Sequence, residues 1–157
     1  MNGANPASTR NVILFGDLSI AYDERVLVPR EWTAMQSRWA AELAEEAPPG
    51  PVLELCCGAG QIGLLAAAAT ERSLVQIDAN PIACAYAGEN ARTAGIADRT
   101  DVRCSDIREA VRPGERFAIV IADPPYLRSD ETDRFPDDPL SAIDGGTDGL
   151  DVVRLCL

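Results

Sequence analysis

Four consecutive residues, Asp123-Pro124-Pro125-Tyr126, are the part of this chain best suited to chemistry. They directly follow the apolar run at residues 117–122, which predicts a buried strand that ends in a turn. Each proline fixes its own φ and keeps the preceding residue extended, so the carbonyls of Asp123 and Pro124 are expected to project from the turn. Such a site can accept hydrogen bonds from a planar –NH2 group while the ring of Tyr126 packs on its face. The alternative is a proline-rich turn without a ligand.

A glycine-rich turn at residues 54–63 stands between a predicted strand and a predicted helix. Gly58 and Gly60 have no Cβ, which lets the backbone approach a ligand closely at the positive end of the helix. A glycine turn alone is weak evidence, but its position after a strand and before a helix is the context of a nucleotide-type cofactor site.

Two carboxylates end the next two predicted strands. Asp78 follows Gly58 by 20 positions, the spacing of an acid that binds ribose hydroxyls. The alternative for Asp78 is a turn residue or a second cap beside Asn80. Asp106 can accept a hydrogen bond from an adenine amino group with Ile107 covering the ring, but it is equally well suited to cap a helix. With Asp123, these acids are expected at the C-terminal edge of a parallel sheet, where open α/β sheets bind ligands.

The composition narrows the possible chemistry. The 157 residues include no histidine, and every basic residue is an arginine, which excludes a histidine base and a Schiff-base lysine. A net charge of −11 opposes non-specific binding to nucleic acid. The five cysteines form no C-x-x-C pair, so we expect no metal site. No apolar run approaches the ~20 residues of a membrane span, and the polar N-terminus predicts a cytoplasmic protein without membrane attachment.

Alternating strands and helices supply the scaffold for these residues. Short extended segments around Gly16 predict a hairpin within an N-terminal segment at residues 1–30, and residues 31–157 are expected to form the main domain. A helix after Arg30 carries one apolar stripe, formed by Trp32, Met35, Trp39 and Leu43. The predicted strands are residues 51–55, 73–77, 100–104 and 117–122, with helices at 61–71 and 81–93 between them and a last helix capped by Asp148. This alternation indicates an α/β fold with a parallel sheet and right-handed crossovers.

Taken together, the glycine turn, the acids and the tetrapeptide resemble the class I S-adenosylmethionine-dependent methyltransferases. The resemblance covers the chain from about residue 26 to 154 and implies a Rossmann-like, doubly wound, mostly parallel sheet. Family members continue through three more strands, so in this chain the sheet is expected to be truncated after the fourth strand and following helix. S-adenosyl-L-methionine is the implied cofactor. The positions that match the family's cofactor site are Glu54, Cys56, Cys57, Gly58, Ala59, Gly60, Asp78, Ala79, Asp106 and Ile107. The tetrapeptide Asp123, Pro124, Pro125 and Tyr126 matches the catalytic site of enzymes that methylate amino or amide nitrogens.

Two further segments resemble one branch of this family, the HemK-type protein-(glutamine-N5) methyltransferases. Residues 26–30 with Thr33 are similar to a segment near the start of their catalytic domain, which implies cofactor contacts for Arg30 and Thr33. Residues 145–151 are similar to their Gly-Gly-x-Asp-Gly-Leu-Asp stretch. The implied activity is methylation of a glutamine side-chain amide in a protein substrate such as a peptide-chain release factor.

Two alternatives remain open at this point. Those enzymes carry Asn-Pro-Pro-Tyr, whereas Asp123 is the form commoner among adenine-N6 methyltransferases acting on RNA or DNA. A base-flipping enzyme would need the same –NH2 site. The acidic stretch at residues 127–140, which we expect to cover the acceptor site, disfavours nucleic acid. The other alternative is a cofactor-binding fragment without turnover. The oligomeric state is not predicted.

Overall fold

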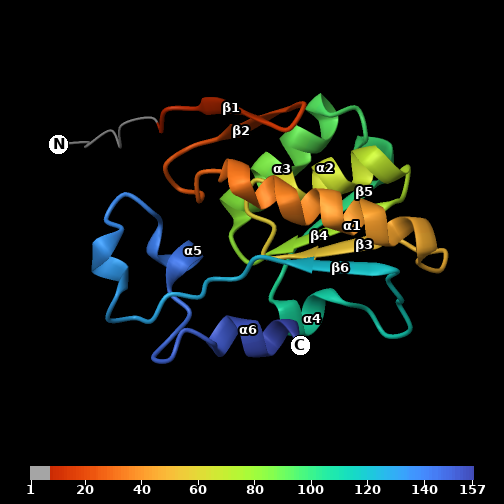
Figure 1. Cartoon of the computed structure of the whole chain (residues 1–157). Helices are drawn as coiled ribbons and strands as arrows, with labels where there is room; N and C mark the ends of the chain where they lie inside the picture. Colours follow the sequence, from red (N-terminus) through yellow and green to blue (C-terminus); the bar gives the residue numbers. More distant parts are fainter. Residues whose placement is uncertain (1–7) are drawn as a thin grey trace.

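A parallel sheet of four strands organises the molecule, as a computed structural model describes it for residues 8–157. The strands are β3 (Val52–Leu55), β4 (Leu74–Asp78), β5 (Thr100–Cys104) and β6 (Ile119–Ala122), in the order β5-β4-β3-β6 (Figure 1). All three strand pairs are parallel. The strand order reverses direction at β3, as expected for a doubly wound sheet. The predicted α/β, Rossmann-like class is confirmed.

Helices cover both faces of the sheet. One face carries α1 (Ala34–Glu46), α2 (Gln61–Thr70) and α3 (Pro81–Thr93), and the other carries the short α4 (Ile107–Ala110) and α6 (Asp151–Cys156) (Figure 1). The remaining helical turns are Glu31–Thr33, Ala97–Arg99, Thr132–Arg134 and α5 (Leu140–Ile143). Because both faces are covered, successive apolar residues of the central strand β3 are all buried.

An N-terminal hairpin packs on the α2–α3 side of the sheet. Its strands β1 (Asn11–Phe15) and β2 (Leu18–Tyr22) are antiparallel, and Gly16 at the turn has φ +61°. Phe15 and Ile20 are buried in the same core as the central strands. The extended conformation expected for residues 25–28, after the hairpin, does not form a strand, because Val26 N donates to Asp23 O and turns the chain. Residues 1–7 of the predicted N-terminal segment lie outside the described residues, and the boundary at residue 30 stays a prediction.

The first long helix is present, but its apolar stripe is not its buried face. Trp32 and Met35 are each 72% exposed, and Trp39 is 65% exposed. The buried side is made of small residues, namely Ala34, Ser37, Ala40 and Ala44. They let α1 approach α2 closely, and Ser37 Oγ donates to Ile62 O at 2.8 Å. The predicted stripe of large apolar residues is therefore not the face that α1 buries; packing against α2 buries the face of small residues instead.

This orientation of α1 has a measurable consequence for stability. We expect Trp39→Ala to lower the free energy of unfolding by no more than about 1 kcal/mol, because the indole is largely exposed. The matched core variant Leu64→Ala should lose about 2–5 kcal/mol, since Leu64 is fully buried. Urea denaturation of both variants provides the comparison. Equal losses would mean that Trp39 is packed in solution.

The last helix begins later than predicted. Asp148 does not cap it: its Oδ1 accepts from Leu150 N, and its carboxylate pairs with Arg154 inside α6. In contrast, Asn80 caps α3 as predicted, with its Oδ1 accepting from Ile82 N. Within residues 8–157, no helix has the length and apolar character needed to cross a membrane.

Candidate active site

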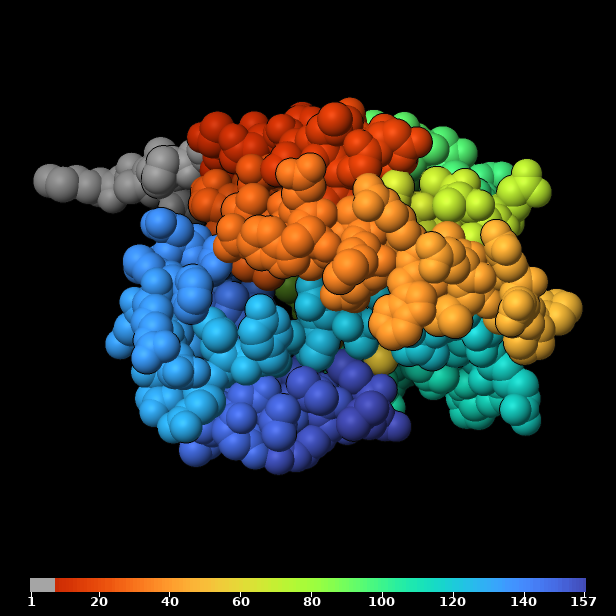
Figure 2. Space-filling model, in the orientation of Figure 1, coloured from red at the N-terminus to blue at the C-terminus, as the bar shows by residue number. Residues whose placement is uncertain are grey.

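A pocket of about 560 Å³ opens at the C-terminal ends of the four parallel strands. This volume is within the range of small-molecule sites, and the position is where open α/β sheets bind ligands. Figure 2 shows a hollow between the orange N-terminal elements and the blue C-terminal segment. The lining residues are Val26, Leu27, Cys56, Cys57, Gly58, Gln61, Ile62, Asp78, Ala79, Asn80, Ala83, Asp106, Ile107, Asp123, Pro125, Ser141, Ala142, Val152 and Leu155.

The glycine-rich turn has a left-handed backbone at three positions. Cys56, Gly58 and Gly60 have φ values of +56°, +54° and +84°. Of the turn residues predicted to bind a cofactor, Cys56, Cys57 and Gly58 line the pocket, whereas Ala59 and Gly60 are buried behind it. A Cβ on Gly60 would stand 2.7 Å from Gln76 Nε2, so this position combines a positive φ with a close approach. At Gly58 the turn presents backbone without a side chain to the pocket.

Glu54 lies beneath this turn and outside the pocket lining. Its carboxyl group is buried, and Gln76 Nε2 donates to Glu54 Oε2 at 2.6 Å and to Gly60 O at 2.9 Å. Burial raises the pKa of Glu54 to about 8. The structure thus connects Glu54 to the ligand side of the turn through Gln76 and Gly60. A direct contact between Glu54 and a cofactor stays a prediction.

The raised pKa of Glu54 predicts how stability depends on pH. Between the ordinary pKa of 4.5 and the folded value of about 8, the unfolded chain is ionised at Glu54 and the folded chain is not. The free energy of unfolding should therefore fall as pH rises, by about 1.4 kcal/mol per pH unit from this group. Glu54→Gln should remove that slope in urea titrations at pH 5, 6.5 and 8. An unchanged slope would contradict the buried neutral carboxyl.

Asp78 joins the second strand to the glycine turn. Its Oδ2 accepts from Gly58 N at 2.8 Å, and its Oδ1 accepts from Asn80 N at 2.9 Å. Burial raises the pKa of Asp78 above its usual value. Asp78 and Ala79 both line the pocket. The Asp78 carboxylate connects the two loops and also borders the cavity. Its position therefore fits both a turn-stabilising role and the predicted contact with ribose hydroxyls.

Asp106 and Ile107 stand at the start of α4, after β5. Asp106 Oδ1 accepts from Arg108 N, which makes it the N-cap of this short helix. Both residues also line the pocket. A carboxylate next to an apolar side chain is an arrangement that can take a purine ring and its amino group. The cap and the predicted adenine contact are therefore compatible.

The tetrapeptide borders the same pocket from β6. Asp123 and Pro125 are lining residues, whereas Pro124 and Tyr126 are not, and the side chain of Tyr126 is 67% exposed. Burial raises the pKa of the Asp123 carboxyl. Among the described residues, no hydrogen bond reaches the Asp123 carboxylate, so its oxygens are free to accept one from a ligand.

The segment before α1 contributes different residues from those predicted. Arg30 pairs with Asp138 at 2.8 Å, 108 positions away, and Thr33 Oγ1 donates to Arg30 O. Neither lines the pocket, whereas Val26 and Leu27 do. The Arg30–Asp138 pair connects this segment to the loop after the tetrapeptide. A cofactor contact by Arg30 or Thr33 stays a prediction.

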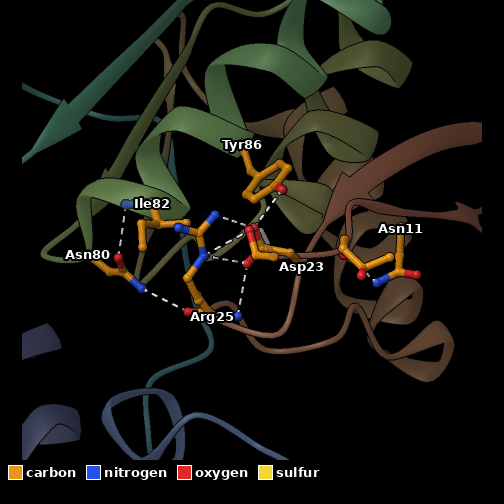
Figure 3. Close-up of polar contacts among 8 residues, drawn as sticks. Asn11, Asp23, Arg25, Asn80, Ile82 and Tyr86 are labelled. Atoms are coloured by element: carbon orange, nitrogen blue, oxygen red, sulfur yellow. Dashed lines mark hydrogen bonds and ion pairs between the residues drawn. The ribbon is translucent and has the colours of Figure 1, made fainter. Parts of the chain in front are cut away.

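A hydrogen-bonded network around the buried Asp23 (Figure 3) stands directly before Val26 and Leu27, which line the pocket. Asp23 is fully buried and accepts from the Arg25 guanidinium and from Tyr86 Oη at 2.8 Å. These donors hold the pKa of Asp23 well below its usual range. Asn80 Nδ2 donates to Arg25 O at 3.2 Å, so the turn is attached to the loop that follows Asp78. The sequence does not predict this network, because Tyr86 and Asn80 lie 63 and 55 positions from their partners.

Further lining residues come from elements that carried no motif signal. Ser141 and Ala142 of α5, and Val152 and Leu155 of α6, also line the pocket. Gln61 lies in the lining at the start of α2, and its Oε1 is buried without a hydrogen-bond partner among the described residues. Such an orphaned acceptor costs free energy unless something bonds to the amide, and a ligand in this pocket can do so.

The arrangement brings residues of the glycine turn, Asp78, Asp106 and Asp123 together around one cavity. Family comparison agrees with this geometry, since the "Methyltransferase small domain" family matches residues 37–135. The chain belongs to this methyltransferase family. The matched region begins inside α1, includes the tetrapeptide and ends in the loop that follows it.

Individual relatives of this methyltransferase domain are glutamine methyltransferases by name. A release factor glutamine methyltransferase of Clostridium acetobutylicum is 33% identical over 147 residues, which are 89% of this chain and 52% of that protein. A ribosomal protein uL3 glutamine methyltransferase of Burkholderia pseudomallei is 32% identical and covers 84% of this chain and 47% of its own length. The chain therefore spans about half the length of these curated relatives.

Solved structures support the fold of the domain. The hMettl16 catalytic domain, solved in complex with a MAT2A 3′UTR hairpin, superposes with a TM-score of 0.71 at 16% identity. The match covers 88% of this chain and 54% of that one. At this identity the likeness is one of fold.

Proposed function

We propose that this protein transfers a methyl group from S-adenosyl-L-methionine to the side-chain amide nitrogen of a glutamine in a protein substrate, with release of S-adenosyl-L-homocysteine and one amide proton. One observation carries the proposal: Asp123 and Pro125 line the same cavity as Gly58 and Asp78. The proposed –NH2 acceptor site and the proposed cofactor turn therefore share one space. Methyl transfer needs this proximity, because the acceptor nitrogen must reach the methyl carbon directly.

The chain's residues fit this cofactor. Gly58 would approach its amino-acid end, Asp78 would accept from the ribose hydroxyls, and Asp106 with Ile107 would take the adenine. Gln61 lies in the lining of the same pocket, and within residues 8–157 its buried Oε1 accepts no hydrogen bond. When bound, the cofactor supplies a methyl group already activated by its sulfonium. No residue is then needed as a covalent nucleophile, which suits a chain without histidine or lysine.

The acceptor is positioned by the tetrapeptide. Asp123 would accept one N–H of the amide, the Pro124 carbonyl would accept the other, and Tyr126 would close over the amide plane. Its present exposure leaves the ring free to do so. These bonds would strengthen as positive charge develops on the nitrogen, so they favour the transition state over the ground state.

A protein acceptor is favoured over a nucleic acid for two reasons. Both named relatives act on protein glutamines, one on a release factor and one on ribosomal protein uL3. The chain itself has a net charge of −11, which repels a phosphate backbone. A release factor or a ribosomal protein is the proposed partner, and the cytoplasm is the proposed location.

Two measurements test the proposal. Calorimetry should detect binding of S-adenosylmethionine to the folded protein; absence of binding would overturn the function. Transfer of a labelled methyl group is then measured with release factor, uL3, and adenine-containing RNA and DNA. Label on a protein glutamine is the expected result. Label on adenine with none on protein would replace the proposed acceptor by a nucleic acid.

A further inference from the structure

We propose that residues 143–149, the glycine clamp, hold the acceptor loop at residues 123–126 in its working conformation, and that Gly145 and Gly149 are positioning residues for methyl transfer. The inference rests on the proposed function. It assigns a role to the Gly-Gly-x-Asp-Gly stretch, which lines no part of the pocket. Figure 1 shows the chain leaving β6, passing through the outer loop and returning past α5 towards α6.

Backbone hydrogen bonds attach the clamp to the end of the acceptor loop. Leu127 N donates to Ile143 O at 2.9 Å, and Gly145 N donates to Leu127 O at 2.8 Å. Ser129 N donates to Gly146 O at 3.0 Å. These bonds form a short parallel bridge between Leu127 and Asp144, so the two segments are joined as strands are joined in a sheet.

The Asp144 side chain reinforces the same contact. Its Oδ1 accepts from Ser129 Oγ at 2.7 Å and from Gly146 N at 2.9 Å. One carboxylate thus fixes the turn of the clamp and the segment after Leu127 simultaneously. A charged acceptor makes both bonds stronger than neutral ones.

The glycines are required because the clamp touches the acceptor loop through its backbone. A Cβ on Gly149 would stand 2.5 Å from Tyr126 O, and a Cβ on Gly145 would stand 2.8 Å from Pro125 O. Both contacts are with backbone atoms, which cannot move aside as a flexible side chain can. Any side chain at these two positions must therefore displace the acceptor loop or the clamp.

The acceptor loop is consequently fixed at both ends. On one side, Ala122 is the last residue of β6 and pairs with Leu55. On the other side, Leu127 is held by the clamp. Only four residues lie between these anchors, and two of them are prolines with fixed φ. A loop held in this way keeps its acceptor groups in place before substrate arrives, which is where a rate advantage arises.

The test uses Gly149→Ala with Gly95→Ala as the matched control. Gly149 has φ +76° and Gly95 has φ +73°, so alanine is strained similarly at both. A Cβ on Gly95, however, would meet nothing within 4 Å. For Gly149→Ala we expect kcat for methyl transfer to fall about 10- to 100-fold, with the Kd for S-adenosylmethionine changed less than about 3-fold. Gly95→Ala should keep the wild-type kcat.

Hydrogen exchange provides a readout independent of activity. The amide hydrogens of Leu127 and Ser129 should exchange faster in Gly149→Ala, while those of β4 keep their protection. The milder variant Ser129→Ala, which removes one bond to Asp144, should change kcat in the same direction by a smaller factor. It keeps the test valid if Gly149→Ala does not fold.

The outcomes separate this inference from the proposed function. If wild type transfers methyl groups and both Gly149→Ala and Ser129→Ala match it in kcat and exchange, the clamp is overturned. If wild type transfers none, the proposed function fails, and the exchange rates of Leu127 and Ser129 still decide whether the clamp exists. Equal losses of kcat in Gly149→Ala and Gly95→Ala would assign the effect to backbone strain and overturn the positioning role.

Discussion

Asp123→Ala should reduce methyl transfer by at least about 100-fold while the Kd for S-adenosylmethionine stays close to the wild-type value. The carboxylate borders the pocket without a hydrogen-bond partner among the described residues, so its removal deletes an acceptor for the substrate and leaves no protein donor unpaired. A loss of this size is typical of removing one charge-stabilising group from a transition state. Single-turnover kinetics and calorimetry measure the two quantities separately.

Asp123→Asn and Asp137→Ala are the controls for this prediction. Asparagine keeps a carbonyl acceptor at the same position, and it is the residue of the glutamine methyltransferases that the chain resembles, so transfer to glutamine should survive. Asp137 is exposed on the loop after the acceptor site and outside the pocket lining. If Asp123→Ala loses cofactor binding together with transfer, Asp123 has a structural role instead.

The pH dependence of transfer provides a second check on Asp123. Burial raises the pKa of its carboxyl above the ordinary 3.8, so the group is protonated at a higher pH than an exposed aspartate. Transfer should therefore decline as pH falls through this raised pKa, because a protonated carboxyl accepts hydrogen bonds less well. In Asp123→Asn that acid limb should disappear from the pH profile of kcat.

Asp23→Ala should lower the free energy of unfolding by about 3 kcal/mol. Asp23 has no solvent exposure and accepts from Arg25, Tyr86 and Ser8. Removing one member of a buried ion pair costs about 3–5 kcal/mol. We expect the lower end, because the Arg25 side chain is 49% exposed and can turn to water. Urea denaturation at pH 7 measures the loss.

Asp130→Ala is a close control for Asp23→Ala. Asp130 also pairs with an arginine two positions away, Arg128, but its side chain is 65% exposed. Its loss should stay within about 0.5 kcal/mol. The lowered pKa of Asp23 adds an acid test: its contribution is complete above the ordinary pKa of 3.8 and is lost as pH falls below it. Equal losses in the two variants would mean that the Asp23 pair is open to water.

Local patterns of the sequence determined where the strands of the sheet lie along the chain and which residues follow them at the site. Apolar runs marked the four strands, Asn80 and Pro81 marked the start of α3, and the spacing from Gly58 to Asp78 marked the second acid. These signals are reliable because each depends on neighbours within one strand or one turn. A parallel sheet then brings the ends of its strands to one edge, so Gly58, Asp78, Asp106 and Asp123 share a pocket.

Long-range packing decided what the sequence could not. Packing against α2 decides which side of α1 is buried. The Arg30–Asp138 pair joins residues that are 108 positions apart. Glu54 is bonded to Gln76 beneath the turn and is not among the residues that line the pocket. The glycine clamp meets the acceptor loop only after the chain has passed through its outer loop. No spacing rule encodes such contacts, because they depend on where a separate element comes to rest. The sequence alone determined which groups stand at the sheet edge, and the tertiary structure decided which of them face the cavity.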